Sequence, residues 1–171
     1  MTMPAVYFSH GQESGPWGTK IQAMAEAVRG LGCRAESVDY QGIEDPGERA
    51  EKLIAECRDV KESLVLVGSS AGGHVATAAA APLNAIGLFV LAPAYCIGGF
   101  GQLTAPDIPI SIVHGWRDDI VPPDNSIEFA SKCNATLHLV DGDHRLTENI
   151  DEIIRYLSSF IRDLARSDAV G

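Results

Sequence analysis

The chain of 171 residues has few aromatic side chains, few basic ones and no long apolar run. Aromatic residues make up 6% of it, and 13 Lys and Arg residues stand against 23 Asp and Glu residues, for a net charge of -10. Because no basic cluster could neutralise a phosphate backbone, we expect no nucleic-acid partner. No segment has the 18 or more apolar residues of a spanning helix, and residues 1–4 lack signal-peptide character. We therefore expect no membrane association and a cytoplasmic location.

Cysteine is also sparse, and its spacing excludes several kinds of site. The four cysteines lie far apart, with no C-x-x-C pair and no His/Cys spacing typical of zinc, at Cys33, Cys57, Cys96 and Cys133. We expect reduced thiols and no metal. With 46% apolar and 21% charged residues, the composition is that of a globular protein that can bury a core without disulfides or a metal site. The sequence predicts one domain over residues 1–166 and a frayed tail at residues 167–171.

Short apolar runs alternate with stretches of helical period along the chain, which favours parallel strands connected by helices. The expected strands are Ala5 to Ser9, Arg34 to Asp39, Leu64 to Ser69, Ile86 to Ala92, Ile110 to His114 and Thr136 to Val140. The third and fourth runs are apolar almost throughout, as in central strands covered on both faces, whereas the second and last alternate with polar residues. The pattern predicts a three-layer α/β/α sandwich with a mainly parallel sheet of about six strands.

Several of the segments between these runs have apolar residues at helical spacing and are predicted to be helices. The first spans residues 21–31 and ends at a glycine, and the second opens with the capping-box pattern Asp45-Pro46-Gly47-Glu48. An alanine-rich helix is expected over residues 71–81, and a last helix opens near Thr147. Pro93 to Pro109 is the longest irregular stretch, and its length indicates a functional loop.

One motif places a serine between a predicted central strand and the alanine-rich helix. The sequence Gly68-Ser69-Ser70-Ala71-Gly72 matches G-x-S-x-G, whose glycines permit a sharp strand-to-helix turn. Such a turn exposes its serine at the carboxyl end of the sheet, where ligands bind in open α/β folds. Ser70 is the expected nucleophile.

A serine nucleophile needs a histidine base, and the chain contains five histidines. His10 and His114 end strands, His74 lies in the helix after Ser70, and His138 lies within a strand, so we expect structural roles for these four. His144 instead occupies the loop between the last strand and the last helix, on the same carboxyl edge as Ser70. We expect His144 to be the base.

The acid is expected in the loop after the preceding strand, where two aspartates are adjacent. We favour Asp118 and expect Asp119 to be a solvated or structural neighbour. A developing oxyanion also needs N–H donors. The backbone N–H of Ala71 is the first candidate, and the N–H of Gln12, in the turn after the first strand, is the second.

Jointly these motifs resemble the α/β-hydrolase superfamily, in particular small, lidless members such as the YqiA-like carboxylesterases and the acyl-protein thioesterase-like enzymes. The motifs are His10-Gly11, the Ser70 turn, His114-Gly115-x-x-Asp118-x-x-Val121-Pro122 and Gly142-Asp143-His144-Arg145-Leu146. The order serine, acid, histidine is that of the superfamily. The resemblance implies hydrolysis of a small-molecule ester or thioester through an acyl-enzyme, without metal or organic cofactor. The chain departs from larger relatives in lacking two antiparallel first strands and a cap domain.

Without a lid, the acyl pocket must be built from loops, and the aromatic candidates for substrate contact are Trp17, Tyr95, Phe100 and Trp116. An open site favours small or short-chain acyl groups, of about four carbons or fewer. Two alternatives remain open at this point: an amidase or peptidase using the same triad, and a non-catalytic binding module on the same fold. A cysteine nucleophile is disfavoured, because the turn carries serine.

Overall fold

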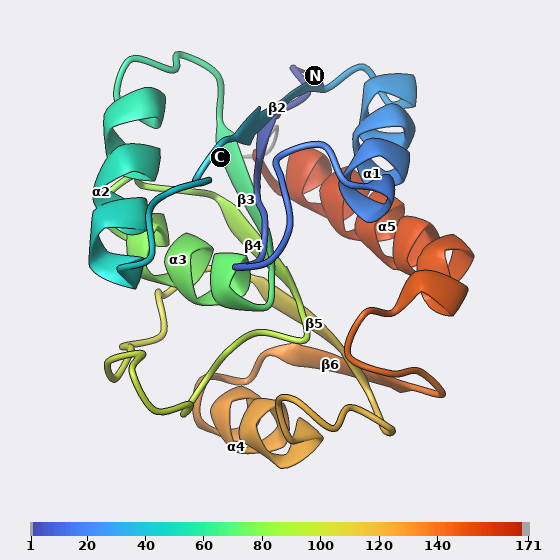
Figure 1. The fold of residues 1–171 in the computed structure, drawn as a ribbon. Helices are drawn as coiled ribbons and strands as arrows, with labels where there is room; N and C mark the ends of the chain where they lie inside the picture. Colours follow the sequence, from blue (N-terminus) through green and yellow to red (C-terminus); the bar gives the residue numbers. More distant parts are fainter. Residues whose placement is uncertain (1, 169–171) are drawn as a thin grey trace.

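A parallel sheet of six strands forms the middle layer of the computed structural model, which describes residues 2–168. The strands are β1 (Ala5–Ser9), β2 (Arg34–Val38), β3 (Leu64–Ser69), β4 (Gly87–Leu91), β5 (Ile110–Gly115) and β6 (Thr136–Val140). Their spatial order is β2-β1-β3-β4-β5-β6, and every neighbouring pair is parallel (Figure 1). All six carboxyl ends therefore lie along one edge, and the predicted architecture is confirmed.

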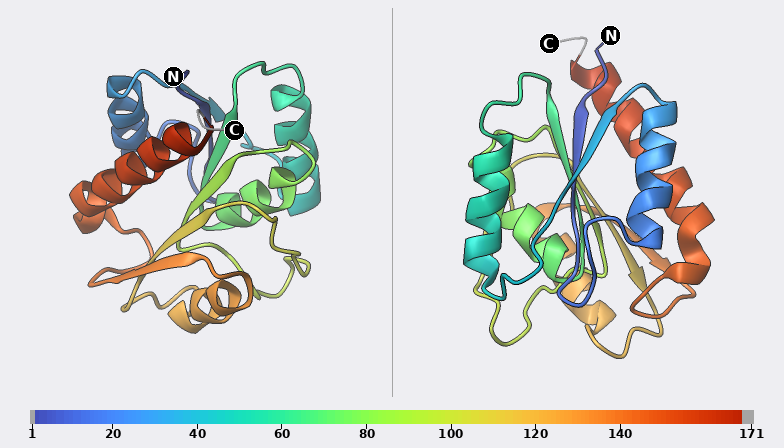
Figure 2. Two further views of the ribbon diagram at one scale, coloured as in Figure 1. Left: turned by 180° about the vertical axis from the view of Figure 1, so that it is seen from behind. Right: turned by 45° about the horizontal axis from the view of Figure 1, so that its top comes forward.

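Helices cover both faces of this sheet. Helices α1 (Thr19–Gly30) and α5 (Ile150–Asp168) pack side by side on one face, and α2 (Pro46–Cys57), α3 (Ala71–Ala80) and α4 (Pro123–Cys133) pack on the other (Figure 2). Asp45 caps α2 as its capping-box pattern predicts, with its side chain accepting a hydrogen bond from the Glu48 N–H. No helix within residues 2–168 combines the length and the apolar character that a membrane span requires.

The packing of the two central strands, β3 and β4, explains why their sequences are almost wholly apolar. In β3, Leu64 and Leu66 pack into the core under α2 and α3, whereas Val65 and Val67 pack into the core under α1 and α5. Strand β4 divides its residues in the same way. Since alternate side chains of a strand point to opposite faces, a strand covered on both sides has no solvent-facing position to fill with polar residues. The edge strands β2 and β6 keep exposed or half-buried positions, as predicted.

Several boundaries and one helix differ from the sequence predictions. Helix α4 was not predicted; only Ser126 and Ala130 on it are buried, with Phe129 and Cys133 partly buried against the core. Helix α5 continues through Asp168, so residues 167 and 168 are helical and do not belong to the predicted tail. Ser167 Oγ donates to the Asp163 carbonyl within the helix. The rest of that tail, residues 169–171, lies outside the described residues. A short 3₁₀ turn, Thr147–Asn149, precedes α5.

Two glycines of the Ser70 turn are required by close backbone packing. A Cβ atom on Gly72 would come within 3.0 Å of the carbonyl oxygens of Ser9 and His10, and one on Gly68 would meet the backbone of Gly72. Real Cβ atoms essentially never approach so closely. Helix α3 can therefore start directly against the carboxyl ends of β1 and β3 only because these side chains are absent.

We predict that Gly72→Ala lowers the free energy of unfolding by about 3 kcal/mol or more, because backbone atoms of β1 would have to move. Gly30→Ala is the matched control, since a Cβ there meets nothing within 4 Å at the end of α1. That variant should leave stability unchanged or raise it by up to about 1 kcal/mol. Chemical denaturation measures both, and equal stabilities for the two variants would contradict the packing argument.

Candidate active site

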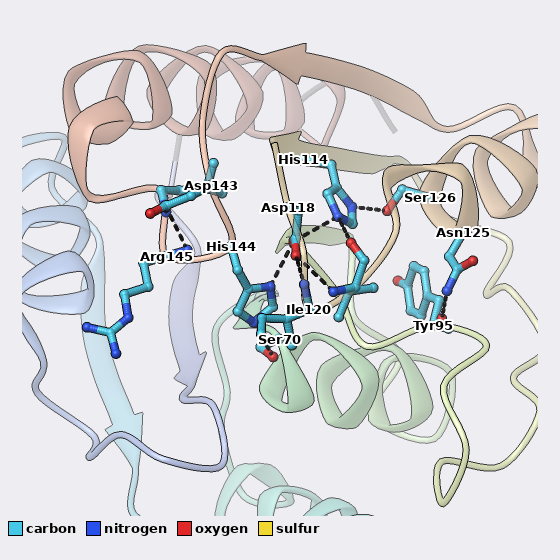
Figure 3. Close-up of polar contacts among 12 residues, drawn as sticks. Ser70, Tyr95, His114, Asp118, Ile120, Asn125, Ser126, Asp143, His144 and Arg145 are labelled. Carbon is cyan, nitrogen blue, oxygen red and sulfur yellow. Dashed lines mark hydrogen bonds and ion pairs between the residues drawn. The ribbon is translucent and has the colours of Figure 1, made fainter. Parts of the chain in front are cut away.

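Ser70 occupies a strained turn between β3 and α3. Its backbone has φ of 54° and ψ of -119°, a conformation that non-glycine residues rarely adopt. Two hydrogen bonds to the end of β4 hold it there: the Ser70 N–H donates to the Leu91 carbonyl, and the Ala94 N–H donates to the Ser70 carbonyl, each at 2.9 Å. The turn presents the Ser70 hydroxyl at the carboxyl edge of the sheet (Figure 3).

His144 lies on the loop after β6, whose shape depends on its neighbour. Asp143 Oδ1 accepts hydrogen bonds from the Arg145 and Leu146 N–H groups, each at 3.0 Å, and Leu146 is fully buried with a φ of 55°. Within this loop the His144 Nε2 atom is 3.0 Å from Ser70 Oγ, and its Nδ1 atom is 2.7 Å from an Asp118 carboxylate oxygen (Figure 3). The imidazole therefore connects the hydroxyl to the carboxylate.

Asp118, and not Asp119, is the aspartate that contacts this histidine. The side chain of Asp118 is fully buried, whereas Asp119 is exposed. Asp118 Oδ1 accepts hydrogen bonds from the N–H groups of Ile120 at 2.9 Å and Val121 at 2.8 Å, while Oδ2 faces His144. Because burying a carboxylate without donors is very costly, these N–H groups stabilise its charged form.

The loops that carry the acid and the histidine are joined through their backbones. The Arg117 N–H donates to the Gly142 carbonyl at 2.9 Å, and the Trp116 N–H donates to the Val140 carbonyl at 2.9 Å. A Cβ atom on Gly115 would clash with the Gly142 carbonyl. Glycine at the end of β5 therefore lets the two loops approach closely enough for Asp118 and His144 to meet.

The residues that carry the two predicted oxyanion donors are next in the chain to groups at Ser70. Ala71 directly follows Ser70 and begins α3, and Gln12 follows Gly11, on which an added Cβ atom would lie 3.6 Å from Ser70 Cβ. His10 shapes this turn: its Nε2 accepts from the Tyr40 N–H at 2.8 Å, and its Nδ1 donates to the Gly11 carbonyl at 2.7 Å. Both ring nitrogens of His10 are thus bound to backbone, which fits the structural role expected for it.

An open cleft of about 850 Å³ surrounds the Ser70 hydroxyl. Apolar side chains from three segments of the chain form part of its wall: Ile21, Ala94, Ile97, Phe100, Ile120 and Val121. Charged side chains also line it: Glu13, Lys20, Asp119, Asp143 and Arg145. The cleft can therefore hold an apolar group against Ser70 while a polar portion of the same molecule faces charged groups.

Of the four aromatic residues expected to contact substrate, only Phe100 lines the cleft. The prediction is wrong for Tyr95, which belongs to the core: its ring stacks on Phe129 and its hydroxyl bonds to Thr77 Oγ1 at 2.6 Å. Trp17 packs under the Arg29 guanidinium and Trp116 is 58% exposed; neither forms part of the wall.

Three isoleucines of the wall were missed. Ile21 was assigned only to the core stripe of α1, and it lies at the start of that helix, next to the cleft. Ile97 and Ile120 lie in loops that follow strands at the carboxyl edge. Of the three, only Ile120 could have been predicted as a wall residue from the sequence, since it is an apolar residue in the loop that carries the predicted acid.

Lys20 connects α1 to the histidine loop. Its Nζ donates to the Arg145 carbonyl at 2.8 Å. Burial lowers the pKa of Lys20 to about 8, although the carboxylates of Asp143 and Asp118 favour its charged form.

Histidine, cysteine and carboxylate side chains within residues 2–168 form no group of three or more that could hold a metal ion.

We predict that Lys20 makes stability rise with pH above neutrality. Between pH 8 and about 10.4, the unfolded chain binds more protons at this amine than the folded chain, so folding becomes more favourable as pH increases. The difference in unfolding free energy, wild type minus Lys20→Met, should therefore increase between pH 7.5 and pH 10. Denaturant titrations of both proteins measure it; a difference that stays flat or falls would contradict the lowered pKa of this amine.

No protein-family model matches the chain, and no curated protein matches its sequence. Among solved structures, a proposed hydrolase of the alpha/beta superfamily from Xanthomonas campestris pv. campestris superposes with a TM-score of 0.89. The two sequences are 30% identical over 94% of this chain and 99% of that protein. The chain belongs to the α/β-hydrolase superfamily. Membership supports hydrolase activity, and it confirms the superfamily that the sequence motifs resemble.

Two further solved structures share the fold at lower identity. A serine hydrolase without a lid, also from Xanthomonas campestris, has a TM-score of 0.81 and 21% identity over 95% of this chain and 83% of its own. Est1E from Butyrivibrio proteoclasticus has a TM-score of 0.80 and 16% identity over 96% of this chain and 89% of its own. At these identities the comparison shows the architecture alone.

Proposed function

We propose that this α/β-hydrolase is a serine esterase or thioesterase that cleaves small or short-chain carboxylic esters or thioesters through an acyl-enzyme. The observation that carries the proposal is the continuous hydrogen-bonded line from Ser70 through His144 to Asp118, at 3.0 Å and 2.7 Å, at the wall of the cleft. A hydroxyl, an imidazole and a buried carboxylate in this order are the components of nucleophilic acyl transfer.

Each member of the line has one role in the proposed reaction. Ser70 Oγ attacks the carbonyl carbon while its proton passes to His144 Nε2, and Asp118 stabilises the imidazolium through its bond to Nδ1. The tetrahedral intermediate collapses as the imidazolium protonates the leaving alcohol or thiol, which leaves an acyl-serine. Water then enters, gives a proton to His144 and attacks the acyl-serine, so that the acid product departs and Ser70 regains its proton.

Backbone N–H groups of Ala71 and Gln12 are the proposed oxyanion donors. Ala71 begins α3, where N–H groups at the start of the helix point outward and the helix dipole favours negative charge. Gln12 also lines the cleft, on the turn shaped by His10. Each donor of this kind typically lowers the barrier by about 3 to 4 kcal/mol.

The shape of the cleft supports small or short acyl groups. The one long connection at the carboxyl edge, Pro93 to Pro109, carries no helix or strand of its own, and from it Ala94, Ile97 and Phe100 contribute to the wall. We expect an acyl chain of a few carbons to pack against wall residues such as Phe100 and Ile120, and a longer chain to extend from the open cleft into water. Longer chains would therefore gain little burial.

The first test concerns the nucleophile. Wild-type protein should form a stoichiometric adduct with a fluorophosphonate probe, and Ser70→Ala should form none and lose roughly 10⁴- to 10⁶-fold in turnover of a p-nitrophenyl ester. Ser131→Ala, an exposed serine on α4, serves as the matched control and should label as wild type does. If wild-type protein is folded yet neither labels nor hydrolyses any ester, the alternative of a non-catalytic binding module replaces the proposal.

The second test distinguishes the adjacent aspartates. Asp118→Asn preserves size but removes the charge that orients and stabilises the imidazolium, so kcat should fall by roughly 10⁴-fold. Asp119→Asn changes an exposed neighbour and should alter kcat only by roughly a few-fold. Steady-state kinetics of the two variants with one ester suffices, and similar losses in both would remove Asp118 from its proposed role.

The third test concerns chain length. In a panel of p-nitrophenyl esters run beside acyl-CoA thioesters, kcat/KM should be highest for acyl groups of about four carbons or fewer, because longer chains gain no further contact with the wall. A rate that climbs steadily towards long chains would refute the short-chain preference while leaving the hydrolytic proposal intact.

A further inference from the structure

A second histidine contacts the buried carboxylate of Asp118. His114, at the end of β5, places its Nε2 atom 3.0 Å from Asp118 Oδ2, the oxygen that also faces His144. The side chains of His114 and Asp118 are both fully buried. Figure 3 shows the two imidazoles on either side of the carboxylate, with His144 towards Ser70 and His114 towards α4.

The surroundings of His114 determine where its proton lies. Its Nε2 atom is also 2.9 Å from the Val121 carbonyl oxygen, so both neighbours of Nε2 are acceptors. Nε2 must therefore carry a hydrogen, which it donates to the Val121 carbonyl, while Asp118 Oδ2 lies 3.0 Å from the same nitrogen. On the other side of the ring, Nδ1 is hydrogen-bonded at 2.7 Å to the hydroxyl of the buried Ser126. Ser126 thus fixes the orientation of the ring, with Nε2 beside Asp118.

The two oxygens of the Asp118 carboxylate have different neighbours. Backbone N–H groups of Ile120 and Val121 donate to Oδ1, whereas His144 Nδ1 and His114 Nε2 lie 2.7 Å and 3.0 Å from Oδ2. Among these groups, His114 is the only one that contacts Oδ2 from the side away from His144, and the His144 ring must itself be held in place. An anchor on the far side keeps Oδ2 where the His144 ring needs it throughout the proton transfers.

We propose that His114, oriented by Ser126, is a positioning residue that holds Asp118 Oδ2 against His144; this inference rests on the proposed function of the Ser70 line. His114 does not contact the reacting atoms and acts only through Asp118. Its removal should therefore lower kcat and leave substrate binding, which the cleft wall provides, unchanged.

Paired substitutions at His114 test this role with a p-nitrophenyl ester. His114→Leu removes the polar contact to Asp118 Oδ2 and should lower kcat by about 10- to 100-fold with little change in KM, the rate equivalent of one lost polar contact to a charged group. His114→Gln keeps an N–H donor at a similar reach and should recover most of that loss. His138→Leu is the control, because His138 stacks on Tyr156 outside the cleft and should not change kcat.

Ser126→Ala keeps His114 but removes the hydrogen bond to Nδ1, so the ring is held less firmly beside Asp118. It should lower kcat by less than His114→Leu does, and it carries the kinetic test if circular dichroism shows that His114→Leu is unfolded. A folded His114→Leu protein with wild-type kcat would overturn the proposal, as would equal losses in the Leu and Gln variants or a loss confined to KM. If Ser126→Ala is the only one of these variants that folds, an unchanged kcat in that variant would overturn the proposal.

Proton NMR provides a readout that needs no turnover. The proton shared by His144 Nδ1 and Asp118 should give a far-downfield resonance in wild type and in His114→Gln, and this resonance should shift or disappear in His114→Leu. An unchanged resonance in folded His114→Leu would overturn the positioning role. Failure of wild-type protein to hydrolyse esters or label with fluorophosphonate would instead overturn the proposed function, so the two failures are distinguishable.

Discussion

Backbone segments at the carboxyl edge of the sheet approach one another too closely for side chains to fit between them, and the arrangement of the site depends on this. Helix α3 begins against the end of β1 because Gly72 has no Cβ atom, and the loops after β5 and β6 meet because Gly115 has none. Each approach brings a chemically active side chain into place: the first exposes Ser70, and the second brings Asp118 to His144. The glycines therefore define the geometry of the site without taking part in its chemistry.

The same edge contains two costly features, and the rest of the fold supports both. Ser70 adopts a strained backbone conformation, held by hydrogen bonds to the end of β4, and the Asp118 carboxylate is fully buried. Strained turns and buried charges persist only where surrounding structure over-determines them. Two central strands packed on both faces supply that rigidity, because their residues cannot shift without opening two cores at once.

Much of the fold could be predicted because its signals are local. Apolar runs such as Leu64 to Ser69 correspond to strands within a residue or so, and the capping box at Asp45 marks the start of α2. Helix α4 escaped prediction because its buried face is small and partly polar, with Ser126 contacting His114. Tyr95 was misplaced for the opposite reason: a tyrosine in a loop beside a predicted site looks like a ligand contact, and only packing shows that its ring belongs to the core.

The sequence by itself determined the six strands, four of the five α-helices within residues 2–168, the superfamily, and Ser70 and His144 as residues proposed to carry the chemistry. Each of these is encoded in a short segment with its own spacing. Tertiary structure decided which neighbours meet across the chain: that Asp118 rather than Asp119 turns inward, that isoleucines form the cleft wall, and that His114 contacts the same carboxylate as His144. Such contacts depend on how loops from different strands converge at one edge, and no local pattern of residues records that convergence.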